Sequence, residues 1–297
     1  MSNKTTEKKS EAGYGTTGHS WDGIEEWNNP LPRWWLWTFY ATVIWGLIYT
    51  ILYPAWPLVH RATPGLLGYS TRAEVEEQIA AFKARNAALE EKLAHADLTK
   101  IKDDPDLYNY AIRSGAAVFR NNCSQCHGAG AAGAKGYPNL LDDDWLWGGT
   151  IEDIAYTVRN GVRNEQSPDA RWSEMPAFGR DGILSEEEIA SVVQYVLKIS
   201  GQPHDEARAA AGEEVFLDNC AGCHGEDGKG DPSVGAPNLT DAIWLYGGDE
   251  ATITETVTNA RFGVMPAWSQ EYRSAGGLTD SQINAVATYV HQLGGGQ

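Results

Sequence analysis

The last two-thirds of this 297-residue chain repeat one pattern twice, and this repeat constrains the fold more than any other feature. Gly115–Phe119 recurs 97 residues later as Gly212–Phe216, and the same offset relates Cys123–His127 to Cys220–His224. Three shorter segments repeat in the same order, namely Pro138–Leu140 with Pro237–Leu239, Trp145–Gly149 with Trp244–Gly248, and Met175–Phe178 with Met265–Trp268. Such self-similarity predicts two copies of one domain.

Each copy closes on a helix with a clear start signal. A Ser or Thr followed three residues later by Glu or Gln forms a capping box, in which each side chain bonds the other's backbone N–H. The pairs are Ser185 with Glu188 before helix 189–199, and Thr279 with Gln282 before helix 283–293. No alternating strand pattern stands out, so we predict a mainly α fold with domains at 105–201 and 205–297.

The four cysteines form two identical motifs, Cys123-Ser-Gln-Cys126-His127 and Cys220-Ala-Gly-Cys223-His224. This spacing is the attachment signature of a c-type haem, in which two thioether bonds fasten the porphyrin and the histidine ligates the iron. A thioredoxin-like redox pair, a zinc site and two internal disulfides are the alternatives. Two such motifs in one repeat favour two covalently bound haem c groups, with Cys123, Cys126, Cys220 and Cys223 as attachment points and His127 and His224 as axial ligands.

Met175 and Met265 are the only methionines besides Met1, and each lies in a Met-Pro-Ala-aromatic segment at an equivalent repeat position. A buried methionine is usually a core gap-filler. The equivalent positions instead predict that both are the second axial ligands. We expect pairing within each domain, His127 with Met175 and His224 with Met265, while an exchange between the domains stays open. His/Met ligation raises the reduction potential and fills both axial positions.

Several further residues have weaker assignments. The carbonyls of Pro138 and Pro237 are expected to accept the ring N–H of the two axial histidines. Trp145, Trp147, Trp244 and Tyr246 are expected either to wall the haem pockets or to pack in the core. The remaining histidines have no repeat partner and are interpreted as surface or linker residues: His19, His60, His95, His204 and His291.

Residues 34–53 carry no charge, and twenty helical residues span the roughly 30 Å hydrocarbon core of a membrane. Trp34, Trp35 and Trp37 gather at one end and Tyr49, Tyr53 and Trp56 at the other, as expected for aromatic belts. A cleaved signal peptide is the alternative, but no small-residue cleavage pair follows the apolar run. We therefore predict a membrane anchor.

The segments around the anchor divide the rest of the chain. Residues 1–33 are polar and are expected to form a cytoplasmic tail with disorder at its start. Residues 54–104 are predicted to be a linker with an amphipathic helix over 71–100, where Thr71 is a candidate cap with Glu74 three residues on. The apolar positions of this helix are Val75, Ile79, Phe82, Leu89 and Leu93.

Haem attachment places the repeat on the periplasmic side of the inner membrane, and basic residues before the anchor give weak support for a cytoplasmic N-terminus. The formal net charge is −17, and residues 101–297 hold 29 of the 40 acidic but only 13 of the 23 basic residues. An acidic surface repels nucleic acid and attracts a basic partner, although it is equally a means of solubility. No phosphate loop, dinucleotide fingerprint or nucleophile elbow is present, so no catalytic residue is predicted.

Each repeat resembles a class I cytochrome c domain, with its motif near the first helix, a later methionine and a closing helix. That resemblance implies that the first and last helices cross. The residues that match the crossing are Gly115 with Phe119, Gly212 with Phe216, and Tyr195 and Tyr289 on the last helices.

The N-terminal part resembles a more specific family. Gly18–Glu26 and Asn28–Trp35 are similar to the leader of the dihaem subunit of cbb3-type cytochrome c oxidases, CcoP or FixP. The resemblance covers nearly the whole chain, although some members have two spans and this chain shows one. It implies an electron carrier, not an enzyme by itself, within a proton-translocating oxidase. Electrons would pass from a basic or membrane-tethered cytochrome c through a monohaem partner to the haem–copper subunit that reduces oxygen.

Three other functions stay open at this point. They are a free-standing membrane-anchored dihaem shuttle, the cytochrome subunit of a periplasmic dehydrogenase, and a dihaem peroxidase. Two equivalent Met-Pro-Ala sites argue against a peroxidase, which needs an open axial position. The sequence does not give the reduction potentials, the haem that first accepts electrons, the donor, or the anchor face that contacts partner subunits.

Overall fold

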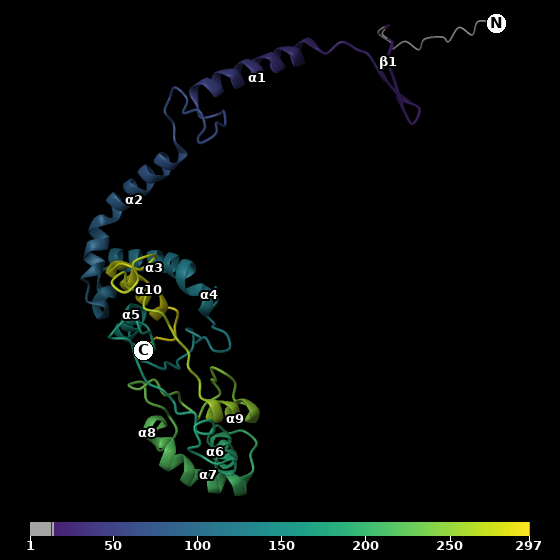
Figure 1. The fold of residues 1–297 in the computed structure, drawn as a ribbon. Helices are drawn as coiled ribbons and strands as arrows, with labels where there is room; N and C mark the ends of the chain where they lie inside the picture. Colours follow the sequence, from purple (N-terminus) through teal and green to yellow (C-terminus); the bar gives the residue numbers. More distant parts are fainter. Residues whose placement is uncertain (1–12, 14, 297) are drawn as a thin grey trace, which may run out of the picture. The chain divides into compact units, whose positions relative to one another are not determined.

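A computed structural model describes residue 13 and residues 15–296. The predicted disorder at the start of the chain concerns residues that lie outside this range. Contact clustering divides the chain into two units, residues 1–84 and 85–297, which are described separately. The elements of both units are drawn in Figure 1.

The first unit begins with a two-stranded antiparallel hairpin, β1 (Thr16–Trp21) and β2 (Ile24–Trp27), in which Trp21 pairs with Ile24. The sequence analysis did not predict it. The turn is Asp22-Gly23, and both residues have positive φ, 50° and 82°. An Asp-Gly pair is a strong hairpin signal because both positions tolerate the left-handed conformation. This dipeptide was therefore the sequence feature that could have predicted the hairpin.

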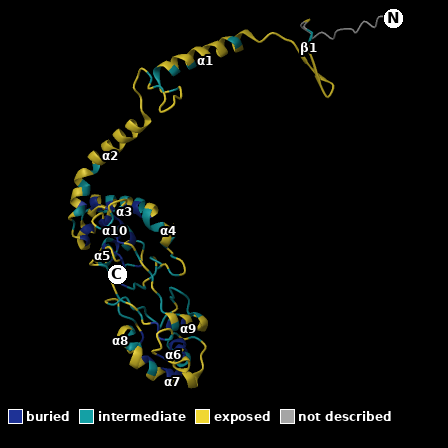
Figure 2. Ribbon diagram, viewed as in Figure 1, coloured by how far each residue is buried: buried dark blue, intermediate teal, exposed yellow. Residues whose placement is uncertain are grey.

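The candidate membrane helix is α1 (Arg33–Leu52), one residue earlier at each end than predicted. Among the described residues it is one helix that is long and apolar enough to cross a membrane. None of its residues is buried within the protein, and Figure 2 colours it almost entirely as exposed. Tyr53 ends the helix in an extended conformation, as expected before Pro54.

The second long helix, α2 (Thr71–Ala94), is shorter than the predicted 71–100, because a 3-10 turn, η1 (Leu98–Asp103), follows it. The predicted cap at Thr71 is wrong. The hydroxyl of Ser70 instead accepts a hydrogen bond from the N–H of Ala73 at 3.3 Å. Of the five predicted apolar positions, only Leu89 and Leu93 join a hydrophobic core, while Val75, Ile79 and Phe82 are exposed.

The second unit is built from short helices joined by long loops. Most helices begin at a side-chain cap, and both predicted capping boxes, at Ser185 and Thr279, are present. The helices are α3 (Pro105–Val118), the π-turn η2 (Phe119–Cys123), α4 (Ser124–His127), α5 (Ile151–Asn160), α6 (Glu186–Ile199), α7 (Glu206–Asn219), α8 (Ala221–His224), α9 (Glu250–Asn259) and α10 (Asp280–His291).

These helices pack in two groups that do not follow the chain. Helix α3 crosses α10, which also contacts α5, whereas α6 packs on α7 and α9. Figure 1 shows α3, α5 and α10 together and α6, α7 and α9 together. The predicted domains 105–201 and 205–297 are therefore not the packing units, because the last helix of each repeat lies against the first helix of the other.

Both helix crossings use the residues that the resemblance indicated. A Cβ on Gly115 would overlap the carbonyl of Ala285 on α10, and one on Gly212 would overlap that of Ser191 on α6. Beside these close approaches, the rings of Phe119 and Tyr289 lie 5.6 Å apart and those of Phe216 and Tyr195 lie 5.1 Å apart. The predicted crossing is present twice, but with the partners exchanged.

Candidate functional site

Each Cys-x-x-Cys-His motif follows the first helix of its repeat and ends in one helical turn, α4 or α8. The ring Nδ1 of His127 lies 3.0 Å from the carbonyl of Pro138, and that of His224 lies 3.0 Å from Pro237. Both predicted hydrogen bonds are present. An N–H donated at Nδ1 leaves the lone pair on Nε2, the atom that then faces a metal.

Burial lowers the pKa of both histidines, although the carbonyl hydrogen bond opposes the shift. An imidazole whose pKa falls below its usual value of about 6.5 is neutral at physiological pH. A metal binds the neutral imidazole. The surroundings therefore favour the neutral imidazole of His127 and His224, which is the form that binds a metal.

The first cysteine of each motif is half-buried and the second is exposed. Burial, with a smaller effect of the neighbouring cysteine, raises the pKa of Cys123 and of Cys220 to about 11. Reactive and redox cysteines have lowered pKa values. The motifs thus lack the electrostatic signature of a thioredoxin-like pair and suit attachment of a group through both sulfur atoms.

The methionines lie with the motif of the other repeat. Met265 packs against the hydrophobic core that holds Cys123 and Phe119, and Met175 packs against the core that holds Cys220 and Phe216. The expected pairing within each domain, His127 with Met175 and His224 with Met265, is contradicted by this packing. The reason is that α6 packs on α7 of the second repeat and α10 packs on α3 of the first. Each methionine segment directly precedes one of these helices and lies against the same core.

The chain crosses between the cores just after α5 and α9. Val162 and Met265 exchange two backbone hydrogen bonds, of 2.9 and 3.0 Å, as an antiparallel bridge. Beyond the methionines, Trp268 N–H donates to the carbonyl of Val158, and Phe178 N–H donates to that of Val257. Each Met-Pro-Ala segment is thus tied to the last turn of a helix in the core that it enters.

A cavity of about 780 Å³ lies beside the second motif. Its lining includes His224, Cys220 and Cys223, together with Met175 from the other repeat. Apolar side chains from α6, α7 and α9 form one wall, namely Val192, Val196, Phe216, Ile253 and Val257, and charged side chains, among them Asp144, Arg163 and Arg261, also line it. A cavity with an apolar wall, two thiols, an imidazole and a thioether fits a covalently bound haem with two axial ligands.

The four aromatic residues singled out from the repeat divide between the two expectations. Trp244 and Tyr246 line this cavity, whereas Trp145 packs against the core that contains Cys123. Trp147 is buried and stands where a Cβ on Gly235 would be. Among the histidines without a repeat counterpart, His95, His204 and His291 are not part of the cavity lining. His19, His60, His95 and His204 are exposed.

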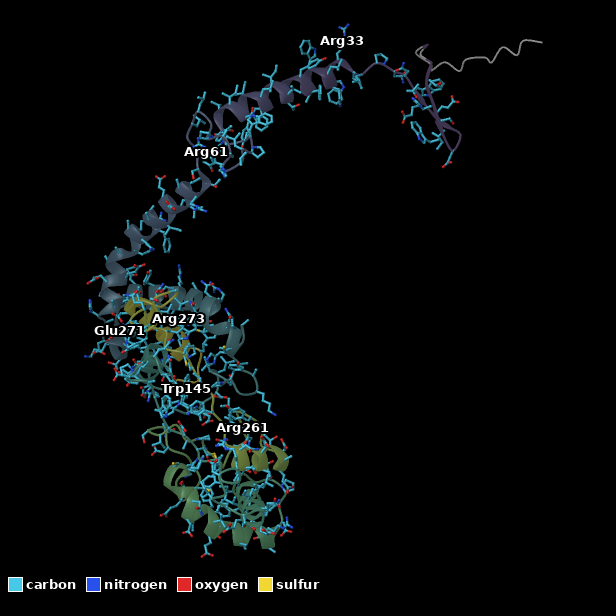
Figure 3. The ribbon with its side chains drawn as sticks, in the orientation of Figure 1. Arg33, Arg61, Trp145, Arg261, Glu271 and Arg273 are labelled. Atoms are coloured by element: carbon cyan, nitrogen blue, oxygen red, sulfur yellow. The ribbon has the colours of Figure 1, made fainter. Side chains whose placement is uncertain are left out.

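Two arginines beside the methionines were not predicted. The guanidinium of Arg171 stacks on Trp147 and donates to the hydroxyl of Thr157 at 2.9 Å. Arg261, labelled in Figure 3, stacks on Tyr246 and donates to Thr256 at 3.1 Å. Each arginine precedes its methionine by four residues, and this shared spacing was the available sequence signal.

Comparison with known proteins gives three family matches in chain order. Residues 13–60 match the N-terminal domain of cytochrome oxidase-cbb3, FixP; residues 110–196 match cbb3-type cytochrome c oxidase subunit III; and residues 209–294 match cytochrome c. The fold and the motifs therefore define a c-type cytochrome with two cytochrome c domains after one candidate membrane helix. Cytochrome c domains bind haem c covalently, through cysteine thioethers.

Curated relatives cover the chain almost from end to end. A cbb3-type cytochrome c oxidase subunit CcoP of Cereibacter sphaeroides is 63% identical over 95% of both chains, and a CcoP of Rhodobacter capsulatus is 59% identical over 100% of both. A FixP of Bradyrhizobium sp. strain ORS 278 is 52% identical over 98% of this chain and 99% of the relative. The chain belongs to the CcoP/FixP family of cbb3-type cytochrome c oxidase subunits, as the leader and the repeat indicated.

Proposed function

We propose that this chain is the electron-transfer subunit of a cbb3-type cytochrome c oxidase, an electron carrier that works through two covalently bound haem c groups. The observation that carries the proposal is the packing of each Cys-x-x-Cys-His motif with one Met-Pro-Ala segment. That packing would give each of two haems one histidine and one methionine ligand. The family relationship supports the oxidase as the complex in which these electrons are used.

The roles of the side chains follow from their positions. Cys123 and Cys126, like Cys220 and Cys223, would each fasten one haem through two thioether bonds. When bound, the haem supplies an iron that takes up and releases one electron. The carbonyls of Pro138 and Pro237 hold the axial histidine rings in one orientation, 3.0 Å from each Nδ1, and the apolar walls exclude water.

We assign the ligand sets across the repeats, as His127 with Met265 and His224 with Met175. The shared cores support this assignment, because Met265 and Cys123 pack against one core and Met175 and Cys220 pack against the other. Thioether ligation raises the reduction potential, which suits acceptance of electrons from a c-type cytochrome. Two filled axial positions also exclude oxygen from these sites.

The partners and the topology complete the proposal. We place the N-terminal tail in the cytoplasm, α1 in the inner membrane and both haem sites in the periplasm. The partners are then the monohaem and the haem–copper subunits of the oxidase. The excess of acidic over basic residues in 101–297 favours a basic cytochrome c donor, whose attraction would weaken with salt.

The proposal is tested by purifying the tagged full-length chain from its own membranes in mild detergent. We expect copper, b-type haem, a second c-type subunit and oxygen-dependent oxidation of cytochrome c in the eluate. Haem staining should reveal two covalent haems on this chain. A lone polypeptide with two haems and no copper would instead support a free-standing shuttle, and a chain with fewer than two covalent haems would contradict the site assignment.

A further inference from the structure

One arginine contacts the two segments that lead to the methionines, residues 171–175 and 261–265. The Nε of Arg163 donates to the carbonyl of Gly263 at 2.7 Å, and its Nη1 donates to the carbonyl of Ser173 at 3.0 Å. Gly263 precedes Met265 by two residues, and Ser173 precedes Met175 by two residues. A single guanidinium thus donates to both segments, in each case two residues before the methionine.

Arg163 belongs to a segment that only the first repeat contains. Arg261 follows Thr256 by five positions in the second repeat, whereas its counterpart Arg171 follows Thr157 by fourteen positions in the first. The additional residues form a closed loop in which the N–H of Arg163 donates to the carbonyl of Arg171 at 2.8 Å. The loop also supplies Val162, the backbone partner of Met265.

The surroundings of Arg163 fix its side chain. Its guanidinium lies 5.4 Å from the ring centre of Phe262, and its own φ is +50°, a conformation that costs energy for a residue with a long side chain. A planar guanidinium donates several hydrogen bonds in one rigid plane, which an ammonium group does not reproduce. An arginine with a strained backbone, hydrogen-bonded to the segments before both methionines, indicates a positioning function.

We propose that Arg163 is a positioning residue that clamps the two segments before Met265 and Met175. It keeps both methionines in place as axial ligands and couples one site to the other. This inference rests on the proposed exchanged ligand sets. The clamp acts on the two segments through the carbonyl groups of Gly263 and Ser173, and Arg163 also lines the cavity beside His224. Its loss therefore loosens both methionines together.

The test uses the full-length holoprotein with Arg163→Lys and Arg163→Gln. Carbon monoxide binds reduced haem only where an axial position opens, so its binding reports the release of methionine. Loss of one charge-assisted hydrogen bond should raise the fraction of both haems that bind carbon monoxide by about tenfold. We also expect both reduction potentials to fall and the methionine-to-iron charge-transfer band to weaken.

Arg180→Gln is the matched control, because Arg180 is an exposed arginine that pairs with the adjacent Asp181. It should leave carbon monoxide binding and both potentials unchanged. The lysine variant separates geometry from charge. If Arg163→Lys behaves like the unaltered protein while Arg163→Gln does not, the residue acts through its charge and the clamp is refuted. Unchanged behaviour of both variants also refutes it.

Phe262→Leu keeps the test decisive if the Arg163 variants fail to accumulate. It removes the ring that stacks on the guanidinium and that also contacts Trp172 edge-to-face, and it should produce the same changes in both haems to a smaller extent. Changes at neither haem would overturn the clamp. The unaltered protein is measured first. Carbon monoxide binding there would contradict the proposed ligand sets and, with them, the clamp, whereas no binding there and unchanged variants would refute the clamp alone.

Discussion

At the residue scale, the histidine environment was readable from the sequence because it depends on a short loop. Pro138 and Pro237 each follow their axial histidine by little more than ten residues, and both carbonyls accept the expected hydrogen bond. The arginines were not readable in the same way. Arg163 acts on residues that lie up to 100 positions away, so no local pattern marks it.

Asp144 gives a prediction at this scale. Burial, and then the negative charges of Asp241, Asp142 and Asp143, raise the pKa of Asp144 to about 6. The folded protein therefore binds this proton more tightly than the unfolded chain does. Its stability falls as pH rises from about 4 through 6, and the loss is complete above that range.

Asp144→Asn should remove this cost. We expect the variant holoprotein to be more stable than the unaltered one by about 1–2 kcal/mol at pH 7.5, and no more stable at pH 4, from thermal unfolding. Asp218→Asn is the control, because Asp218 is an exposed carboxylate that is not among the acids raising the pKa of Asp144. A gain of equal size at both pH values would show that the charge of Asp144 is not responsible.

At the scale of elements, helix starts were predicted better than helix lengths. Ser185 and Thr279 cap α6 and α10 as expected, because a capping box involves only four neighbouring residues. The amphipathic helix was predicted to continue to residue 100 but ends at Ala94. The hairpin at residues 16–27 was not predicted, although its turn dipeptide Asp22-Gly23 tolerates the positive φ that such a turn requires.

The crossing segment after α5 gives a prediction at this scale. Gly161 has a φ of +76°, and a Cβ there would overlap the carbonyl of Met265. Gly161→Ala should therefore displace the segment that contains Met265 and lower the reduction potential of one haem. It should also destabilise the protein by about 1–3 kcal/mol. Potentiometry of both haems and thermal unfolding measure the two effects.

Gly182→Ala is a closely matched control for that experiment. Gly182 also has a positive φ, of +67°, but no heavy atom lies within 4 Å of the site of its Cβ. It should cost about 1 kcal/mol through the backbone alone and leave both potentials unchanged. Equal changes of potential in the two variants would mean that contact with Met265 is not the cause.

At the scale of the whole molecule, the central feature is the exchange of the closing helices between the repeats. Met265 and Cys123 therefore pack against one core, and Met175 and Cys220 against the other. Under the proposed assignment, each haem site takes residues from both repeats and neither repeat alone holds a complete ligand set.

The exchange is tested in a full-length background with Cys220→Ala and Cys223→Ala, which retains one covalent haem. There Met265→His should lower the reduction potential of that haem, because His/His ligation lacks the raising effect of a thioether. Met175→His should leave it unchanged. The opposite result would restore the pairing of His127 with Met175 that the order of the chain suggests.

The sequence by itself determined the motifs, the repeat, the anchor helix and the family, because each of these depends on neighbouring residues or on a fixed spacing. It did not determine which helix closes which core. Gly115 and Gly212 offer the same flat surface, and Tyr289 and Tyr195 offer the same ring, so either pairing satisfies the local pattern. Only the tertiary structure decided between the two pairings. The choice depends on which segments contact each other after α5 and α9, such as Val162 with Met265.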